Sequence, residues 1–115
     1  MALPSKYRFS NSNEIKEVFK RGKSLDSGFF QIRFIPAAPG LKRFAFIVGL
    51  KVSKKAVIRN RIKRKISEII KLNLLKFKPG YLIVILVKPQ AADKEPENLE
   101  EDLVNSLVKI GRWVR

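Results

Sequence analysis

The stretch YLIVILV at residues 81–87 constrains the fold of this chain more than any other feature. It is an uninterrupted apolar run, and the KPG sequence at 78–80 ends any helical pattern before it. A strand that is apolar on both faces must be covered on both faces, which predicts that it is central in its sheet. Because it is far shorter than a bilayer is thick, it does not predict a membrane span.

Two further strands are predicted upstream of this central one. Residues 28–35 alternate so that Phe30, Ile32 and Phe34 share one side, and residues 42–50 alternate in the same way. The PAAPG sequence at 36–40 between them predicts a turn or loop. The simplest interpretation is a pair of adjacent antiparallel strands.

Three helices complete the prediction. The first lies within residues 10–24, with Ser12 or Asn13 as its cap, Gly22 at its end and Ile15, Val18 and Phe19 on one face. The second follows Ser53, a candidate cap, and carries its apolar stripe at Ile58, Ile62, Ile66 and Ile69. The third is capped by Asp93 or a neighbour, has Pro96 in its first turn and a stripe of Leu99, Leu103, Leu107 and Ile110.

The element order is therefore helix-strand-strand-helix-strand-helix. We expect an α+β two-layer sandwich around a small mixed sheet, in a single domain over residues 1–115. Its basic part covers residues 1–92, with 21 basic residues and four acids, and an acidic-start C-terminal helix covers about 95–112. The acids in this last helix suit its first turns, because the helix dipole favours negative charge there.

Charge is the most unusual property of the composition. The chain has 25 Lys and Arg residues against 10 Asp and Glu, a net charge of +15, which predicts a polyanionic partner. It has no cysteine and no histidine, which excludes disulfides, the common zinc sites and thiolate nucleophiles. The N-terminus has no apolar run of signal-peptide length, so we expect a cytoplasmic protein that binds no membrane.

The second predicted helix concentrates this charge. The twelve residues KKAVIRNRIKRK at 54–65 contain seven cations and no acid. Like charges four residues apart repel by a few tenths of a kcal/mol per pair, so a helix selected only for stability would interleave glutamate. Because Asn60, Arg61 and Arg64 face away from the apolar stripe, we interpret this helix as a phosphate-binding surface.

Several functions are compatible with these residues alone. A subunit of a ribonucleoprotein enzyme and a structural RNA-binding protein, such as a ribosomal component, fit the composition equally well. A protein-only nuclease ranks lowest, because six of the ten acids lie at 93–102 and no clear carboxylate pair remains beside the basic helix. DNA binding by a helix in the major groove leaves no recognisable pattern, and we expect no DNA partner.

The sequence KVSKKAVIRNRIKRKISEI at 51–69 resembles the signature helix of the bacterial ribonuclease P protein subunit, with its Arg-Asn-Arg core and following basic pair. EIKEVFKRGKS, FFQIRF, FAFIVGLKVSKKAV and GYLIVILVKP resemble the family's other elements in order and spacing, so that the resemblance spans roughly residues 3–110. It implies a fold like that of ribosomal protein S5 domain 2. It also implies catalysis by an RNA subunit, with the protein alone inactive, no cofactor tightly bound to the protein, and Mg²⁺ reaching the site through the RNA.

The resemblance further implies two binding regions, for the catalytic RNA and for the single-stranded 5′ leader of precursor tRNA. The RNA-binding residues it implies are Lys51, Lys54, Lys55, Arg59, Asn60, Arg61, Lys63, Arg64 and Lys65. The leader cleft it implies, between the first helix and the sheet, contains Ile15, Phe19, Phe30 and Ile32. Gly49 and Leu50 stand where the family usually has a polar and a basic residue, and Ile15 and Ile32 stand where aromatic residues are frequent.

Overall fold

The computed structural model describes residues 5–9, 11–38, 40–73, 80–91 and 96–109. The helices and strands, in chain order, are η1 (Ser5–Tyr7), α1 (Ser12–Arg21), β1 (Lys23–Asp26), β2 (Phe30–Pro36), β3 (Lys42–Ile47), α2 (Ala56–Leu72), β4 (Tyr81–Val87), η3 (Pro89–Ala91) and α3 (Pro96–Lys109). The predicted order of helices and long strands is therefore confirmed. The short strand β1 was not predicted, because its sequence KSLD lacks apolar alternation.

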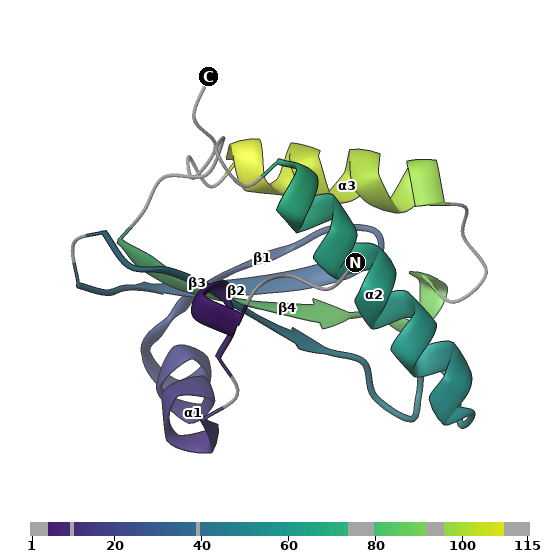
Figure 1. Cartoon of the computed structure of the whole chain (residues 1–115), viewed down its shortest axis with the longest axis horizontal. Helices are drawn as coiled ribbons and strands as arrows, with labels where there is room; N and C mark the ends of the chain where they lie inside the picture. Colours follow the sequence, from purple (N-terminus) through teal and green to yellow (C-terminus); the bar gives the residue numbers. More distant parts are fainter. Residues whose placement is uncertain (1–4, 10, 39, 74–79, 92–95, 110–115) are drawn as a thin grey trace.

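The four strands form one mixed sheet in the order β1-β2-β4-β3 (Figure 1). The apolar strand β4 lies inside the sheet as predicted, antiparallel to β2 and parallel to β3. The prediction that the strands now assigned as β2 and β3 are adjacent is wrong, because β4 lies between them. A buried apolar strand covers more of its surface between two neighbours than at an edge, and this favours its insertion.

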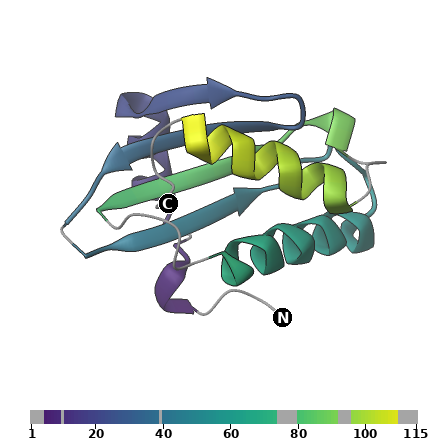
Figure 2. The same cartoon turned by 90° about the horizontal axis from the view of Figure 1, so that it is seen from above.

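Helices cover both faces of the sheet, with α2 and α3 on one side and α1 on the other (Figures 1 and 2). Phe30 and Ile32 of β2 pack in the core with Ile66 of α2 and Leu103 of α3, all without exposed surface. On the other face, Val18 of α1 is fully buried in a smaller cluster. We refer to this second side, onto which α1 packs, as the α1 face.

The helix ends differ in detail from the predicted caps. Asn11, rather than Ser12 or Asn13, caps α1, and its Oδ1 accepts hydrogen bonds from the backbone N–H groups of Asn13 and Glu14 at 2.8 and 3.2 Å. Gly22 ends α1 as predicted, because a Cβ there would clash with the carbonyl oxygens of Val18 and Phe34. Helix α2 is capped by the backbone of Lys55 without a side-chain hydrogen bond, so Ser53 is not its cap. The predicted cap Asp93 and stripe residue Ile110 lie outside the described residues.

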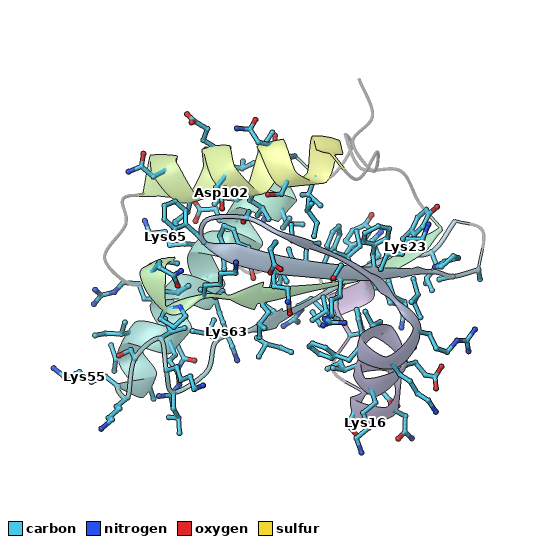
Figure 3. All side chains as sticks on the ribbon, turned by 180° about the vertical axis from the view of Figure 1, so that it is seen from behind. Lys16, Lys23, Lys55, Lys63, Lys65 and Asp102 are labelled. Carbon is cyan, nitrogen blue, oxygen red and sulfur yellow. The ribbon has the colours of Figure 1, made fainter. Side chains whose placement is uncertain are left out.

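A polar network joins α3 to the turn between β1 and β2. Asp102, labelled in Figure 3, accepts hydrogen bonds through Oδ2 from the Ser27 hydroxyl at 2.6 Å and from the Phe29 backbone N–H at 3.0 Å. Lys88, just after β4, donates to the Ser27 carbonyl at 2.8 Å and lies 3.4 Å from the Asp26 carboxylate. The network therefore fixes α3 and the end of β4 against the same turn.

Candidate nucleic-acid interface

The basic residues of α2 lie mainly in solvent. Of the nine RNA-binding residues predicted from the sequence, Arg59 is half-buried and the other eight are exposed. The exposed residues are Lys51, Lys54, Lys55, Asn60, Arg61, Lys63, Arg64 and Lys65. The exposure of those on α2 follows from the helical period, because Ile62, Ile66 and Ile69 on the opposite side of the helix are buried in the core. The prediction that Asn60, Arg61 and Arg64 point outward is confirmed.

Arg59 differs from its neighbours because part of its hydrogen-bonding capacity is used within the protein. Its Nη1 donates to the backbone carbonyl of Ser53 at 3.0 Å. The Ser53 hydroxyl in turn accepts from the Lys55 N–H at 3.2 Å. These bonds hold the segment before α2, so Arg59 positions Lys54 and Lys55 as well as carrying charge of its own.

The basic side chains do not form one flat surface. Figure 3 shows Lys65 on the side of α2 nearer α3, and Lys55 and Lys63 on the side away from it. Asn60, Lys63 and Arg64 lie along an open groove beside β3, whereas Arg61 is not among the residues that line it. The basic side chains therefore lie around much of the exposed circumference of α2 rather than along a single line.

The predicted leader cleft is wrong in two of its four residues. Phe30 and Ile32 have no exposed surface and lie in the core under α2 and α3, whereas Ile15 and Phe19 of α1 belong to the opposite face. Successive side chains of a strand point to opposite faces, so no single cleft brings these four together. The α1 face of β2 carries Gln31 and Arg33 instead.

Arg33 contacts Phe19, the one aromatic residue of the predicted leader cleft that lies on the α1 face. Its guanidinium carbon lies 5.0 Å from the centre of the Phe19 ring, and its Nη1 donates to the Phe19 carbonyl at 3.2 Å. Its Nε donates to the Gln31 side-chain oxygen at 3.4 Å. A cation over an aromatic ring gives a surface with both positive charge and a flat face, the combination to which single-stranded RNA binds.

The opposite side of α1 has a different character. A cleft of about 350 Å³ there is lined by Glu14, Glu17 and Arg21 together with apolar residues of β2 and β4. Glu17 and Arg21 form an ion pair at 3.0 Å, so the cation in this cleft is already partnered. Phosphates are repelled by two carboxylates, which makes the Phe19 and Arg33 side of α1 the better surface for RNA.

The described part of the chain lacks two other kinds of feature. None of its helices is long and apolar enough to cross a bilayer. Within the same residues, no three acidic side chains gather where they could hold a metal ion.

Arg33, Gln31, Arg8 and Arg43 are candidate RNA contacts that the sequence did not reveal. Side chains alternate between the two faces of β2, so Gln31 and Arg33 could have been assigned to the α1 face if the face covered by α1 had been known. Arg8 and Arg43 lie in the groove beside β3 and come from segments with no charge pattern of their own. Only the fold brings them next to the basic helix.

Comparisons with known proteins match this geometry along nearly the whole chain. The family model described as Ribonuclease P matches residues 3–111. The ribonuclease P protein component of Microcystis aeruginosa is 33% identical, over 95% of this chain and 94% of its own. The structure of the RNase P protein from Thermotoga maritima is 26% identical, with a TM-score of 0.82 over 89% of this chain and 96% of that one.

A further structure supports the fold alone. An RNase P protein mutant from Staphylococcus aureus has a TM-score of 0.86 and 24% identity, and the match covers 95% of this chain and 91% of that one. The family match also decides between the functions that composition left open, since a ribosomal component would not be expected to match it over the same length. The chain belongs to the ribonuclease P protein family.

Proposed function

We propose that this protein is the RNA-binding subunit of ribonuclease P, the endoribonuclease that processes precursor tRNA. The observation that carries the proposal is the exposed, arginine-rich α2, in a chain that matches the family from residue 3 to residue 111. The approach to α2 and the helix itself as far as Ser67 lie in a part of the sequence, residues 27–67, that has no acid. Repulsion among its cations is relieved when the phosphates of a folded RNA lie against them.

In this role the protein binds and positions RNA, and the RNA subunit performs the hydrolysis. Each phosphate that a lysine or arginine neutralises lets the RNA subunit and its substrate approach each other at lower electrostatic cost. In this proposal Mg²⁺ is held chiefly by the RNA, and the protein acts by screening charge and positioning the substrate. The partners are therefore the catalytic RNA and precursor tRNA, in the cytoplasm.

The leader of precursor tRNA lies on the α1 face, across Phe19 and Arg33. Bases without a partner strand stack on aromatic rings and guanidinium planes, at about 1–3 kcal/mol per base. Such stacking tolerates any base, which suits a substrate set with varied leaders. Ile15, on the same helix, would add apolar contact without stacking.

The decisive experiment mixes the purified protein with a matching catalytic RNA at low Mg²⁺ and follows the 5′ maturation of a precursor tRNA. We expect efficient cleavage only in the mixture, because charge neutralisation by the protein replaces part of the Mg²⁺ requirement. The controls are protein alone and RNA alone. Cleavage by the protein alone, or no stimulation of the RNA, would contradict the proposal.

A further inference from the structure

An open groove of about 850 Å³ runs along the outer edge of β3, and we call it the edge groove. Its lining residues are Arg8, Phe9, Asn11, Glu14, Arg43, Phe44, Ala45, Phe46, Asn60, Lys63, Arg64 and Ser67. One wall is the N-terminal segment with the start of α1, the other is α2, and β3 forms the floor. Figure 2 shows β3 at the edge of the sheet beside α2, with η1 at the same edge. The groove has the volume of a small-ligand site.

The charge of the edge groove is strongly positive. Arg8, Arg43, Lys63 and Arg64 face a single carboxylate, that of Glu14. The cations come from both walls and from the floor, so an anion inside the groove is attracted from three sides. This arrangement fits a phosphate group, because the arginine fork matches phosphate oxygens with two parallel hydrogen bonds.

Arg43 supplies an independent sign of a missing partner. Its Nε is buried, and of all the described side chains it is the one with a buried nitrogen or oxygen that lacks a hydrogen-bond partner. Leaving such a donor unpaired is unfavourable, and native structures rarely do so. Because Arg43 also lines the edge groove, an acceptor bound there would satisfy the Nε once the guanidinium turns toward it.

The floor of the groove offers contacts for a base as well as for a phosphate. Phe46 is half-buried, so part of its ring is accessible. The carbonyl of Phe44 accepts a hydrogen bond from the Phe9 N–H at 3.1 Å, across the outer edge of β3. Because β3 is parallel to β4, the N–H and C=O groups of every second residue point to the same edge, and those of Phe46 therefore face outward too. A base over Phe46 would find a donor and an acceptor side by side.

We propose that the edge groove binds one unpaired nucleotide of the catalytic RNA, with its base over Phe46 and its phosphate between Arg8 and Arg64. The inference rests on the proposed function and adds a specific contact to it. The catalytic RNA is the source, rather than the leader, because Asn60, Lys63 and Arg64 belong to the basic helix, whereas Phe19 and Arg33 do not line the groove. Unpaired bases that leave the stack are the usual targets of proteins that bind folded RNA specifically.

The test is chemical probing of the catalytic RNA at nucleotide resolution, in complex with the full chain. Wild-type protein should protect the base of one unpaired nucleotide within its footprint. Arg8→Gln, Arg43→Lys and Phe46→Leu should each weaken the protection of that nucleotide about ten-fold and leave the rest of the footprint in place. Arg43→Lys keeps the charge but removes the Nε–H, and Arg8 is exposed, so neither variant threatens the fold. Lys23→Gln, an exposed change outside the groove, is the matched control and should change nothing.

Each outcome decides between specific alternatives. If the variants leave every protection unchanged, or weaken all of them equally, the edge groove does not bind a nucleotide and the inference is wrong. If they weaken the binding of a short leader oligonucleotide instead, the groove belongs to the leader, and the assignment to the catalytic RNA is overturned. If wild-type protein gives no footprint and no stimulation of cleavage, the proposed function itself fails, a result distinct from the other two.

Discussion

Residues next to each other in β2 have opposite roles. Phe30 and Ile32 point into the core under α2 and α3, and Gln31 and Arg33 point to the α1 face. A shift of one position along a strand exchanges the two sets completely. The resemblance in sequence implies Phe30 and Ile32 as leader contacts, whereas the residues of β2 on the α1 face are Gln31 and Arg33. Substitutions at these positions separate a role in the core from the proposed role in binding the leader.

We predict that Phe30→Ala destabilises the protein by about 3–5 kcal/mol, the usual cost of truncating a buried phenylalanine. Urea unfolding followed by circular dichroism measures this. At a temperature where the variant is folded, its preference for precursor over mature tRNA should match that of the wild type. A variant of normal stability with reduced leader preference would show that Phe30 reaches the RNA.

We predict the reverse for Arg33→Gln. The variant keeps a polar side chain beside Gln31 but loses the cation over Phe19, so binding of precursor tRNA by the holoenzyme should weaken about three- to ten-fold relative to mature tRNA. Competition binding with the two tRNA forms gives this ratio. Arg21→Gln, which removes an exposed arginine on the other side of α1, is the control; an equal effect of both changes would point to charge alone.

At the scale of elements, the type of each long helix or strand could be predicted from the sequence, but which strands pair with each other could not. The apolar stripe of α2 and the apolar run of β4 are patterns among residues close together in the chain, so the sequence alone predicts this helix and this strand. The insertion of β4 between β2 and β3 depends on pairing over tens of residues, and β1 is too short and exposed to have a pattern. The edge groove joins three segments distant in sequence, which is why Arg8 and Arg43 carried no signal.

Helix α2 begins under conditions that are unfavourable for a helix alone. Its N-cap Lys55 makes no side-chain hydrogen bond, and its first turn has no acid. We predict that Lys55→Ser stabilises the protein by about 0.5–2 kcal/mol by supplying a capping hydroxyl and removing a cation from the positive end of the helix dipole. The same change should weaken RNA binding. Thermal unfolding and a binding titration on one preparation check both, and a loss of stability would contradict the capping argument.

Helix α3 depends on one carboxylate for its position. Asp102→Ala removes the acceptor of two hydrogen bonds from the turn between β1 and β2, so we expect a loss of about 1–3 kcal/mol in unfolding free energy. Glu101→Ala, at an exposed neighbouring position, is the control and should cost little. Equal losses from the two substitutions would mean that helix propensity, rather than the network, explains the effect.

At the scale of the whole molecule, the net charge of +15 acts on any polyanion, and only the arrangement of the cations selects RNA. Cations of the N-terminal segment, of β3 and of α2 meet at the edge groove, while Arg33 serves a separate surface on the α1 face. The protein therefore presents two separate cationic regions on one small domain. RNA bound at either region as proposed would contact it through phosphates, so binding at both should depend on ionic strength.

We predict that holoenzyme assembly weakens steeply with salt, with a log–log slope of roughly −0.7 to −0.9 per phosphate contacted. The double variant Arg61→Ala with Arg64→Ala should keep its fold, since both side chains are exposed, but bind the catalytic RNA less tightly and with a shallower slope. Filter binding across a salt series measures this, with heparin as a competing polyanion. A slope that the double variant leaves unchanged would remove these arginines from the interface.

The position of β4 between its neighbours has a consequence for synthesis on the ribosome. A nascent chain that ends before residue 81 can form the β1–β2 hairpin. Among the described strands, however, β3 pairs only with β4, and before β4 is made it has only the isolated bridge between Arg8 and Phe44. Helix α2 is translated before β4, so its cationic residues leave the ribosome before the sheet on which α2 packs is complete. Fragments truncated before Tyr81 should thus be insoluble or unfolded. We expect the protein to bind RNA in its folded form only after β4 has left the ribosomal exit tunnel.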